Sequence, residues 1–157
     1  MVMFKTHLAI GFLIGLLSFK FFHFSPLFFI LLVTIFSALP DIDHPKSKYG
    51  RYLWFLSIPI SFFFKHRGFF HSIFPAVIGY FIFMYFKFPL IAWSLLIGYV
   101  AHLIGDCITI EGINFLHPLS TFEIHGPIHT GKFLESILFY FVIGFNIFYL
   151  LKLFNLL

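Results

Sequence analysis

The amino-acid sequence predicts an all-α fold, a multi-pass transmembrane helical bundle that forms one domain over residues 1–157. Three observations predict this fold. Hydrophobic residues make up 61% of the chain and charged residues only 10%, against about 25% charged in soluble domains. The apolar residues also gather into runs that approach the length of a membrane-spanning helix. This composition excludes a cytosolic enzyme, a nucleic-acid-binding domain and a disordered regulator, and it makes the lipid bilayer the first expected partner.

A helix that crosses the hydrocarbon core of a bilayer needs about 20 mostly apolar residues. The apolar run 52–64 is shorter than this, contains Pro59 and is flanked by Arg51 and Lys65. A short apolar segment with cationic flanks is typical of an interfacial or re-entrant helix. The runs that we expect to span the membrane are 8–22, 24–39, 73–86, 88–105 and 136–151, five in all.

The distribution of lysine and arginine predicts the orientation in the cell membrane. If successive loops alternate between the two sides, seven cations share the side of the N-terminus and three lie on the other side. The positive-inside rule then makes the N-terminal side cytoplasmic. The first run resembles a secretory signal, but no small-residue cleavage site follows it, so we expect no cleavage. The seven cations are Lys5, Lys46, Lys48, Arg51, Lys65, Arg67 and Lys132, and the three are Lys20, Lys87 and Lys152.

The same alternation places nearly all the candidate polar residues on the N-terminal side. Only His23 of the nine histidines falls on the opposite side, and the three aspartates, Asp41, Asp43 and Asp106, all share the N-terminal side. Ionisable groups at or within membrane spans are costly to bury and are usually functional. The sequence therefore predicts a polar site at one membrane surface.

Two pairs of these residues have the spacing of metal ligands. His102 and Asp106 are four residues apart, so on a helix they share one face and can bind one ion. Asp41 and Asp43 are two residues apart and follow Pro40, which ends the second run. In an extended backbone both carboxylates would point the same way.

Two further histidines begin expected helices on the same side of the membrane. His7 lies at the mouth of the first span, and His71 precedes Ser72, a residue type that caps helix N-termini. His66 and Arg67 lie shortly before His71 in the sequence. They are expected to orient water or to bind the anionic part of a substrate, because a guanidinium is a planar two-pronged donor. The predicted metal ligands are His7, Asp41, Asp43, His71, His102 and Asp106.

Nitrogen and oxygen ligands without thiolate indicate Zn²⁺, as one or two ions, with Mn²⁺ and Fe²⁺ as alternatives. A bound metal lowers the pKa of its water and generates hydroxide at neutral pH, which predicts a hydrolase. A site at the level of the lipid headgroups, with Arg67 beside it, suggests a phospholipid or another phosphoester as the substrate.

Other interpretations stay open from the residues alone. Asp41 and Asp43 could simply end a helix in contact with water. A metal could brace the loops of a non-catalytic membrane interaction protein, or the polar residues could serve a metal or proton transporter, which would place them near the midplane of the bilayer. No His-Glu-x-x-His motif favours an intramembrane protease. Residues expected to stay solvated are Glu111, His117, Glu123, His125 and His129, and Cys107 is expected to pack.

Several short motifs follow one another between residues 6 and 120, and together they resemble a known family. They are Pro40-Asp41-Ile42-Asp43-His44, His66-Arg67-Gly68-Phe69-Phe70-His71-Ser72 and His102-Leu103-Ile104-Gly105-Asp106. In these the chain resembles the YdjM-like family of membrane-bound, metal-dependent hydrolases. The resemblance implies a multi-pass membrane protein and metal dependence, but no substrate. Phe70 stands where the family commonly has threonine, which removes a hydroxyl group but no expected ligand. The His-x-x-x-Asp helix is also similar to that of zinc-dependent phospholipase C enzymes.

Overall fold

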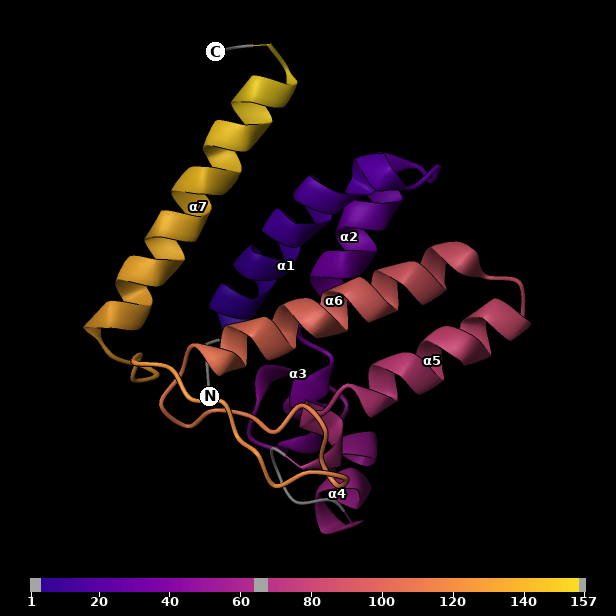
Figure 1. The fold of residues 1–157 in the computed structure, drawn as a ribbon, viewed down its shortest axis with the longest axis vertical. Coiled ribbons are helices and arrows are strands. Elements are labelled where there is room, and N and C mark those ends of the chain that lie inside the picture. Colours follow the sequence, from indigo (N-terminus) through magenta and orange to yellow (C-terminus); the bar gives the residue numbers. More distant parts are fainter. Residues whose placement is uncertain (1–3, 64–67, 156–157) are drawn as a thin grey trace.

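The computed structural model describes residues 4–63 and 68–155 of the chain. This part is helical, with seven α-helices, three 3₁₀ turns and two isolated β-bridges (Figure 1). The α-helices are α1 (Phe4–Ser18), α2 (Pro26–Phe36), α3 (Lys48–Tyr52), α4 (Trp54–Phe63), α5 (Phe74–Tyr85), α6 (Pro89–Cys107) and α7 (Phe133–Leu153). The 3₁₀ turns are η1 (Phe19–Phe21), η2 (Pro40–Asp43) and η3 (Phe69–His71).

Four helical segments of the described chain are long and apolar enough to cross a membrane, which confirms the predicted fold class. They are Phe4–Phe21, Pro26–Asp43, Pro89–Cys107 and Phe133–Leu153. The expected fifth span, 73–86, forms α5, which has only 12 residues. Such a helix rises about 18 Å, well short of a hydrocarbon core of about 30 Å. The number of candidate spans is therefore four instead of five.

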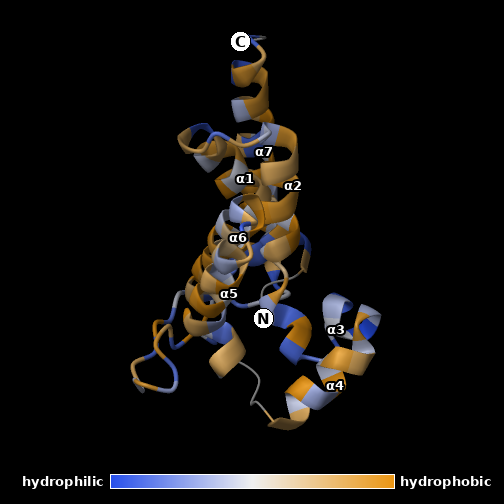
Figure 2. Ribbon diagram, turned by 90° about the vertical axis from the view of Figure 1, so that its right-hand side faces the viewer, coloured by the Kyte–Doolittle hydropathy of each residue, from blue (hydrophilic) through white to orange (hydrophobic). Residues whose placement is uncertain are grey.

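Helices α3 and α4 extend away from the bundle at one end (Figure 2). Helix α4 has 10 residues, contains Pro59 and buries only Ser57. Trp54 and Phe62 are largely exposed. The segment thus forms a short apolar helix, and its placement at the membrane interface stays a prediction.

Helix α6 lies at the centre of the bundle and packs against α1, α2 and α5. Leu95, Tyr99 and Leu103 of α6 are buried in one hydrophobic cluster. The approach to α2 is very close at Gly98, where an added Cβ would lie 2.5 Å from the carbonyl oxygen of Val33. Small residues at such crossings allow membrane helices to pack backbone against backbone.

The polar termini of the helices gather at one end of the molecule. The start of α1, the ends of α2 and α6 and the starts of α5 and α7 all lie there (Figure 1). The α6–α7 connection is held by a bridge between Ile113 and Ile124. The N–H group of Ile73 donates to the carbonyl oxygen of Phe115 at 2.9 Å, which ties this connection to the start of α5.

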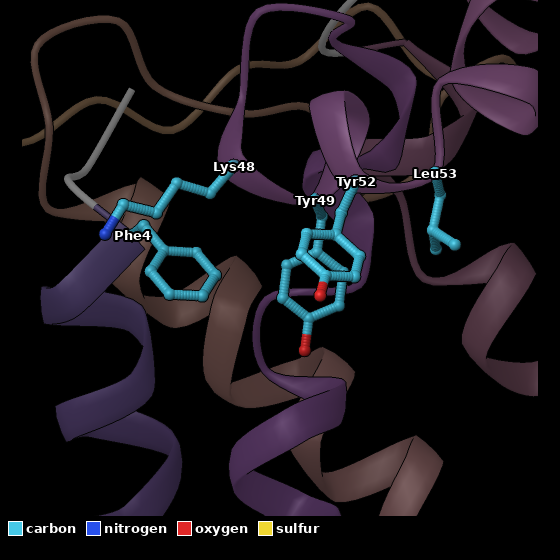
Figure 3. A pocket seen from close by; sticks show the side chains of 5 residues that line it. All are labelled: Phe4, Lys48, Tyr49, Tyr52 and Leu53. Carbon is cyan, nitrogen blue, oxygen red and sulfur yellow. The ribbon is translucent and has the colours of Figure 1, made fainter.

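A cavity of about 380 Å³ opens between the start of α1 and α3 (Figure 3). Its lining is largely apolar and aromatic, with one ammonium group, that of Lys48, 5.1 Å from the centre of the Phe4 ring. The other lining residues are Tyr49, Tyr52 and Leu53.

Candidate metal centre

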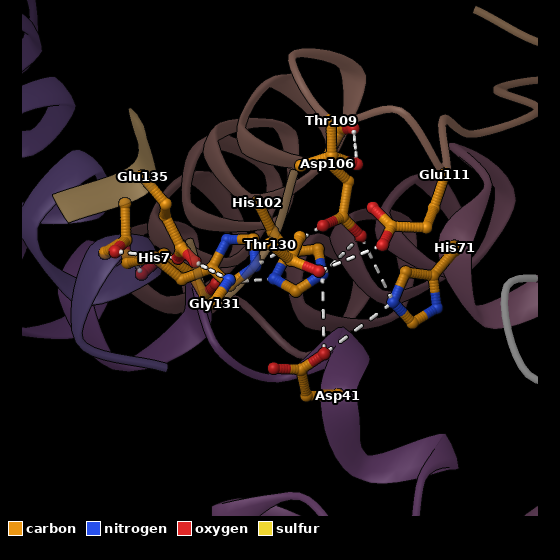
Figure 4. Close-up of polar contacts among 12 residues, drawn as sticks. His7, Asp41, His71, His102, Asp106, Thr109, Glu111, Thr130, Gly131 and Glu135 are labelled. Atoms are coloured by element: carbon orange, nitrogen blue, oxygen red, sulfur yellow. Dashed lines mark hydrogen bonds and ion pairs between the residues drawn. The ribbon is translucent and has the colours of Figure 1, made fainter. Parts of the chain in front are cut away.

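The six residues predicted to bind metal come from four separate elements and meet in one cluster, most of which is drawn in Figure 4. Each side chain is buried, with an exposed fraction of at most 1%. His7 comes from α1, Asp41 and Asp43 from η2, His71 from η3, and His102 and Asp106 from α6. The cluster therefore joins parts of the chain that are up to about one hundred residues apart in sequence.

Local structure brings η2 and η3 against α6. Pro40 begins η2, and the Ser47 hydroxyl donates to the carbonyl oxygen of Asp41 at 2.7 Å, which closes the turn. The Tyr99 hydroxyl of α6 donates to the carbonyl oxygen of Phe70, which holds η3 in place. We expected an extended backbone at the two aspartates, and this was wrong, because the fixed φ of Pro40 suits a helical turn.

Two nitrogens and two oxygens in the cluster form a four-atom group whose nitrogen-to-oxygen distances suit metal ligands. The Nε2 atom of His71 lies 3.7 Å from Asp41 Oδ1 and 3.5 Å from Asp106 Oδ2. The Nε2 atom of His102 lies 3.8 Å and 3.4 Å from the same two oxygens. Ligands of a tetrahedral zinc ion stand about 3.4 Å apart, and those of an octahedral magnesium ion about 3.0 Å. These four nitrogen-to-oxygen distances are closer to the tetrahedral value. The potential ligands whose donor atoms all lie within 4.8 Å of one another form two overlapping groups of three, which are His7, Asp41 and His102, and His71, His102 and Asp106.

The other ring nitrogen of each of these histidines has a hydrogen-bond acceptor. Nδ1 of His102 is 2.9 Å from the carbonyl oxygen of Ser37, and Nδ1 of His71 is 3.1 Å from Asp43 Oδ2. A carbonyl or carboxylate oxygen accepts, so Nδ1 carries the proton in both rings and Nε2 is the atom available to a metal. Asp43 therefore lies behind His71 and holds its ring, whereas Asp41 and Asp106 each contribute an oxygen to the four-atom group.

His7 adds a fifth donor, a third nitrogen, beside this group. Its ring stacks on that of His102, with centroids 3.8 Å apart, and its Nε2 lies 3.5 Å from Asp106 Oδ1. Both ring nitrogens of His7, both carboxylate oxygens of Asp41 and Nε2 of His102 are buried without a hydrogen bond to any described residue. Leaving one such atom unsatisfied costs about 1–3 kcal/mol. A cation held among them would remove that cost, so the donor set fits a metal ion.

The electrostatics of the cluster favour positive charge. Burial alone would lower the pKa of His71, but its contacts with the carboxylates of Asp41 and Asp43 and the nearby charge of Asp106 outweigh burial and raise that pKa to about 9. In the absence of a metal, a proton on this imidazole therefore partly balances three buried carboxylates. A divalent cation would supply the same compensation and displace that proton.

The remaining predicted residues have different placements. The predicted catalytic residues, His66 and Arg67, lie outside the described residues. His23 is exposed at the opposite end of α1, as the alternation of loops predicted. His125 is also exposed, and its Nε2 lies 3.4 Å from Glu123 Oε2. Neither belongs to the two groups of potential metal ligands in the described chain.

One buried acid next to the cluster was missed from the sequence. Glu135, in the first turn of α7, has an exposed fraction of 0%. Its Oε1 accepts a hydrogen bond from the Thr6 hydroxyl at 3.2 Å, and its Oε2 accepts one from the N–H group of Gly131 at 2.6 Å. Because Thr6 precedes His7, Glu135 ties α7 to the part of α1 that carries a potential ligand. The signal was an acid at the start of an otherwise apolar run.

Comparison with known proteins places the chain in a family. The model of the family described as YdjM inner membrane protein matches residues 1–156. The chain belongs to this family. It is 35% identical over 136 residues to a Bacillus subtilis (strain 168) protein named uncharacterized protein YvsG, covering 85% of this chain and 84% of that one.

Two proteins named inner membrane protein YdjM are also similar. Those of Escherichia coli (strain K12) and Shigella flexneri are each 40% identical over 88 residues, which cover 51% of this chain and 44% of theirs. The chain thus spans less than half the length of these two relatives. No solved structure matches the chain at a significant level. The family and the four apolar segments together identify an integral membrane protein.

Proposed function

We propose that the chain is a membrane-embedded, metal-dependent hydrolase with Zn²⁺ as the preferred ion, and that its N-terminus and site lie on the cytoplasmic side. The observation that carries the proposal is the group formed by Asp41, His71, His102 and Asp106, whose imidazole nitrogens and carboxylate oxygens lie 3.4–3.8 Å from one another. Two imidazoles with carboxylates are typical ligands of hydrolytic metal centres. Mn²⁺ and Fe²⁺ use the same ligand types and are the alternatives.

In this proposal each of the predicted site residues has a defined role. A bound metal would supply a water of lowered pKa and a positive charge opposite a developing anion. Asp43 and the carbonyl oxygen of Ser37 hold His71 and His102 with Nε2 facing the ion. His7, stacked on His102, is the additional nitrogen donor. His66 and Arg67 keep their predicted tasks of orienting water and binding the anionic part of the substrate.

The substrate that we propose is an amphiphile with a phosphoester bond, such as a phospholipid. The cavity in Figure 3 supports this, because it combines an apolar wall with the ammonium group of Lys48. Its volume of about 380 Å³ lies in the range of small-molecule sites, about 300–1,000 Å³. The cavity and the cluster lie on neighbouring parts of the chain. Phe4 is one turn from His7 on α1, and α3 follows directly after the turn that carries Asp41.

A second candidate function rests on the complete burial of the cluster. Catalytic metals keep one open coordination position, whereas structural metals are closed off. The six residues have exposed fractions of at most 1% and join α1, η2, η3 and α6. A metal that only braces these elements, in a protein that presents its loops to a partner, would fit this burial. A transporter fits less well, because the cluster is built from residues at the start of α1 and the end of α6, and these helix ends lie at one end of the bundle (Figure 1).

The test combines metal content with activity. The full chain, purified in detergent without chelators, is analysed for zinc, manganese and iron and then incubated with phosphatidic acid and phosphatidylglycerol vesicles. We expect about one or two equivalents of zinc and release of phosphate or a phosphorylated headgroup. His71→Asn should lose both, whereas His23→Asn, at the opposite end of the molecule, should lose neither. A chain that holds metal but releases no product from either lipid would favour the bracing function, and a metal-free chain would refute both.

A further inference from the structure

We propose that a groove between α1 and α7 binds one acyl chain of an anionic phospholipid, with the lipid phosphate at Lys5. The groove has a volume of about 420 Å³ and lies on the outer surface of two candidate spans. Lys5, Leu8 and Phe12 form one wall, at the three- and four-residue spacing of a single helix face. Phe139 and Leu150 mark the extent of the opposite wall on α7. This proposal does not rest on the proposed hydrolysis.

The length of the groove matches one leaflet of a bilayer. From Phe139 to Leu150 the helix α7 rises about 16 Å, and half of the hydrocarbon core is about 15 Å. The groove follows both helices, which run side by side and pack on each other (Figure 1). An acyl chain lying in it would run along the direction of the spans, as lipid chains do in the membrane.

The groove carries its one ammonium group at one end. The Lys5 side chain is exposed, and its Nζ lies 4.7 Å from the centre of the Phe139 ring, which holds the charge over the end of the groove. Glu135, one turn earlier on α7, is buried, and its two oxygens accept hydrogen bonds from Thr6 and Gly131. The charge at this end therefore suits the phosphate of a lipid headgroup.

The same charge argues against a second copy of the chain as the occupant. An apolar helix laid in the groove would cover Lys5 without offering it an anion, and an unpaired buried charge is costly. A phospholipid supplies both parts, an apolar chain for the walls and a phosphate for the ammonium group. An anionic headgroup adds no competing positive charge, so phosphatidylglycerol should bind more tightly than phosphatidylcholine.

The experiment is native mass spectrometry of the full detergent-purified chain, titrated with phosphatidylglycerol and with phosphatidylcholine. We expect one tight phosphatidylglycerol adduct. Lys5→Gln should weaken it about fivefold, whereas Lys20→Gln, at the other end of α1, should change it less than twofold. Ile147→Trp, which fills the groove at a half-exposed position, should abolish the adduct. Phe141→Trp, at an exposed position outside the groove lining, is the matched control and should leave it intact.

Three results would overturn the proposal. One is phosphatidylglycerol binding that is equal in all four variants. Another is equal binding of the two lipids by the unmodified chain. The third is a dimer that Ile147→Trp converts to a monomer, because a second copy would then occupy the groove. Metal content separates this test from the proposed function, since Lys5→Gln should retain the metal of the unmodified chain. Circular dichroism of each variant verifies that it is folded.

Discussion

Replacing Asp106 with asparagine is the most direct test of the metal centre. The change keeps the size of the side chain but removes the negative charge that faces three imidazoles. Asp106 oxygens lie 3.5 Å from His7 Nε2, 3.5 Å from His71 Nε2 and 3.4 Å from His102 Nε2. Among the described residues of the cluster, Asp106 and His71 each have three such contacts and the others have fewer, so this substitution should weaken metal binding strongly.

The expected size of the effect follows from the number of ligands. Four-ligand structural zinc sites bind with about 10–16 kcal/mol, or roughly 3 kcal/mol for each ligand. Loss of one ligand should then weaken zinc binding on the order of 100-fold, since about 1.4 kcal/mol corresponds to a factor of ten. The assay is competition for zinc with a chromophoric chelator of known affinity, carried out on detergent-purified protein.

The control for this prediction is Glu123→Gln, which neutralises an exposed carboxylate outside the cluster. It should leave the zinc affinity unchanged within a factor of two. If Asp106→Asn binds zinc as tightly as the unmodified chain, the four-atom group is not a metal site and the reasoning from donor spacing fails.

Three further outcomes follow from the same geometry. Asp43→Asn should weaken metal binding about 10- to 100-fold by loosening the ring of His71, a smaller loss than that of a ligand in the same chelator competition. Gly98→Ala, which places a Cβ 2.5 Å from a main-chain carbonyl oxygen of α2, should destabilise the fold by about 1–3 kcal/mol. Gly144→Ala, where nothing lies within 4 Å, is its control in thermal unfolding, and equal melting temperatures would contradict the close packing. Glu135→Ala should lower the melting temperature, because the hydroxyl of Thr6 and the start of α7 lose their shared partner; an unchanged melting temperature would show that this contact contributes little.

The helical fold was predictable because apolar run length and prolines leave few alternatives for a chain in a bilayer. The expectation of a fifth span failed because the run 73–86 is shorter than the about 20 residues that a span needs, and α5 occupies nearly all of it. The helix ends at Tyr85, and Lys87 then adopts φ of 60°, which turns the chain toward α6. Such a turn depends on packing against α6, and hydropathy alone carries no information about it.

The gathering of six candidate ligands could also be predicted, because alternating spans bring their polar ends to one side. The separate roles of the residues within the cluster could not be predicted. Asp41 and Asp43 look equivalent in sequence, and only the 3₁₀ turn directs one toward His102 and the other behind His71. Glu135 could not be singled out from the sequence, because its role depends on a hydrogen bond with Thr6, 129 residues away in sequence.

The contacts of Ser37 bear on the order in which the cluster can assemble during membrane insertion. Its hydroxyl donates to the carbonyl oxygen of His7, and its own carbonyl oxygen accepts from His102, so this one residue joins α1, the end of α2 and α6. A nascent chain that has inserted only its first two helices lacks His102 and Asp106 altogether. The complete donor set therefore exists only after α6 has docked, which makes assembly of the cluster a late event in biogenesis.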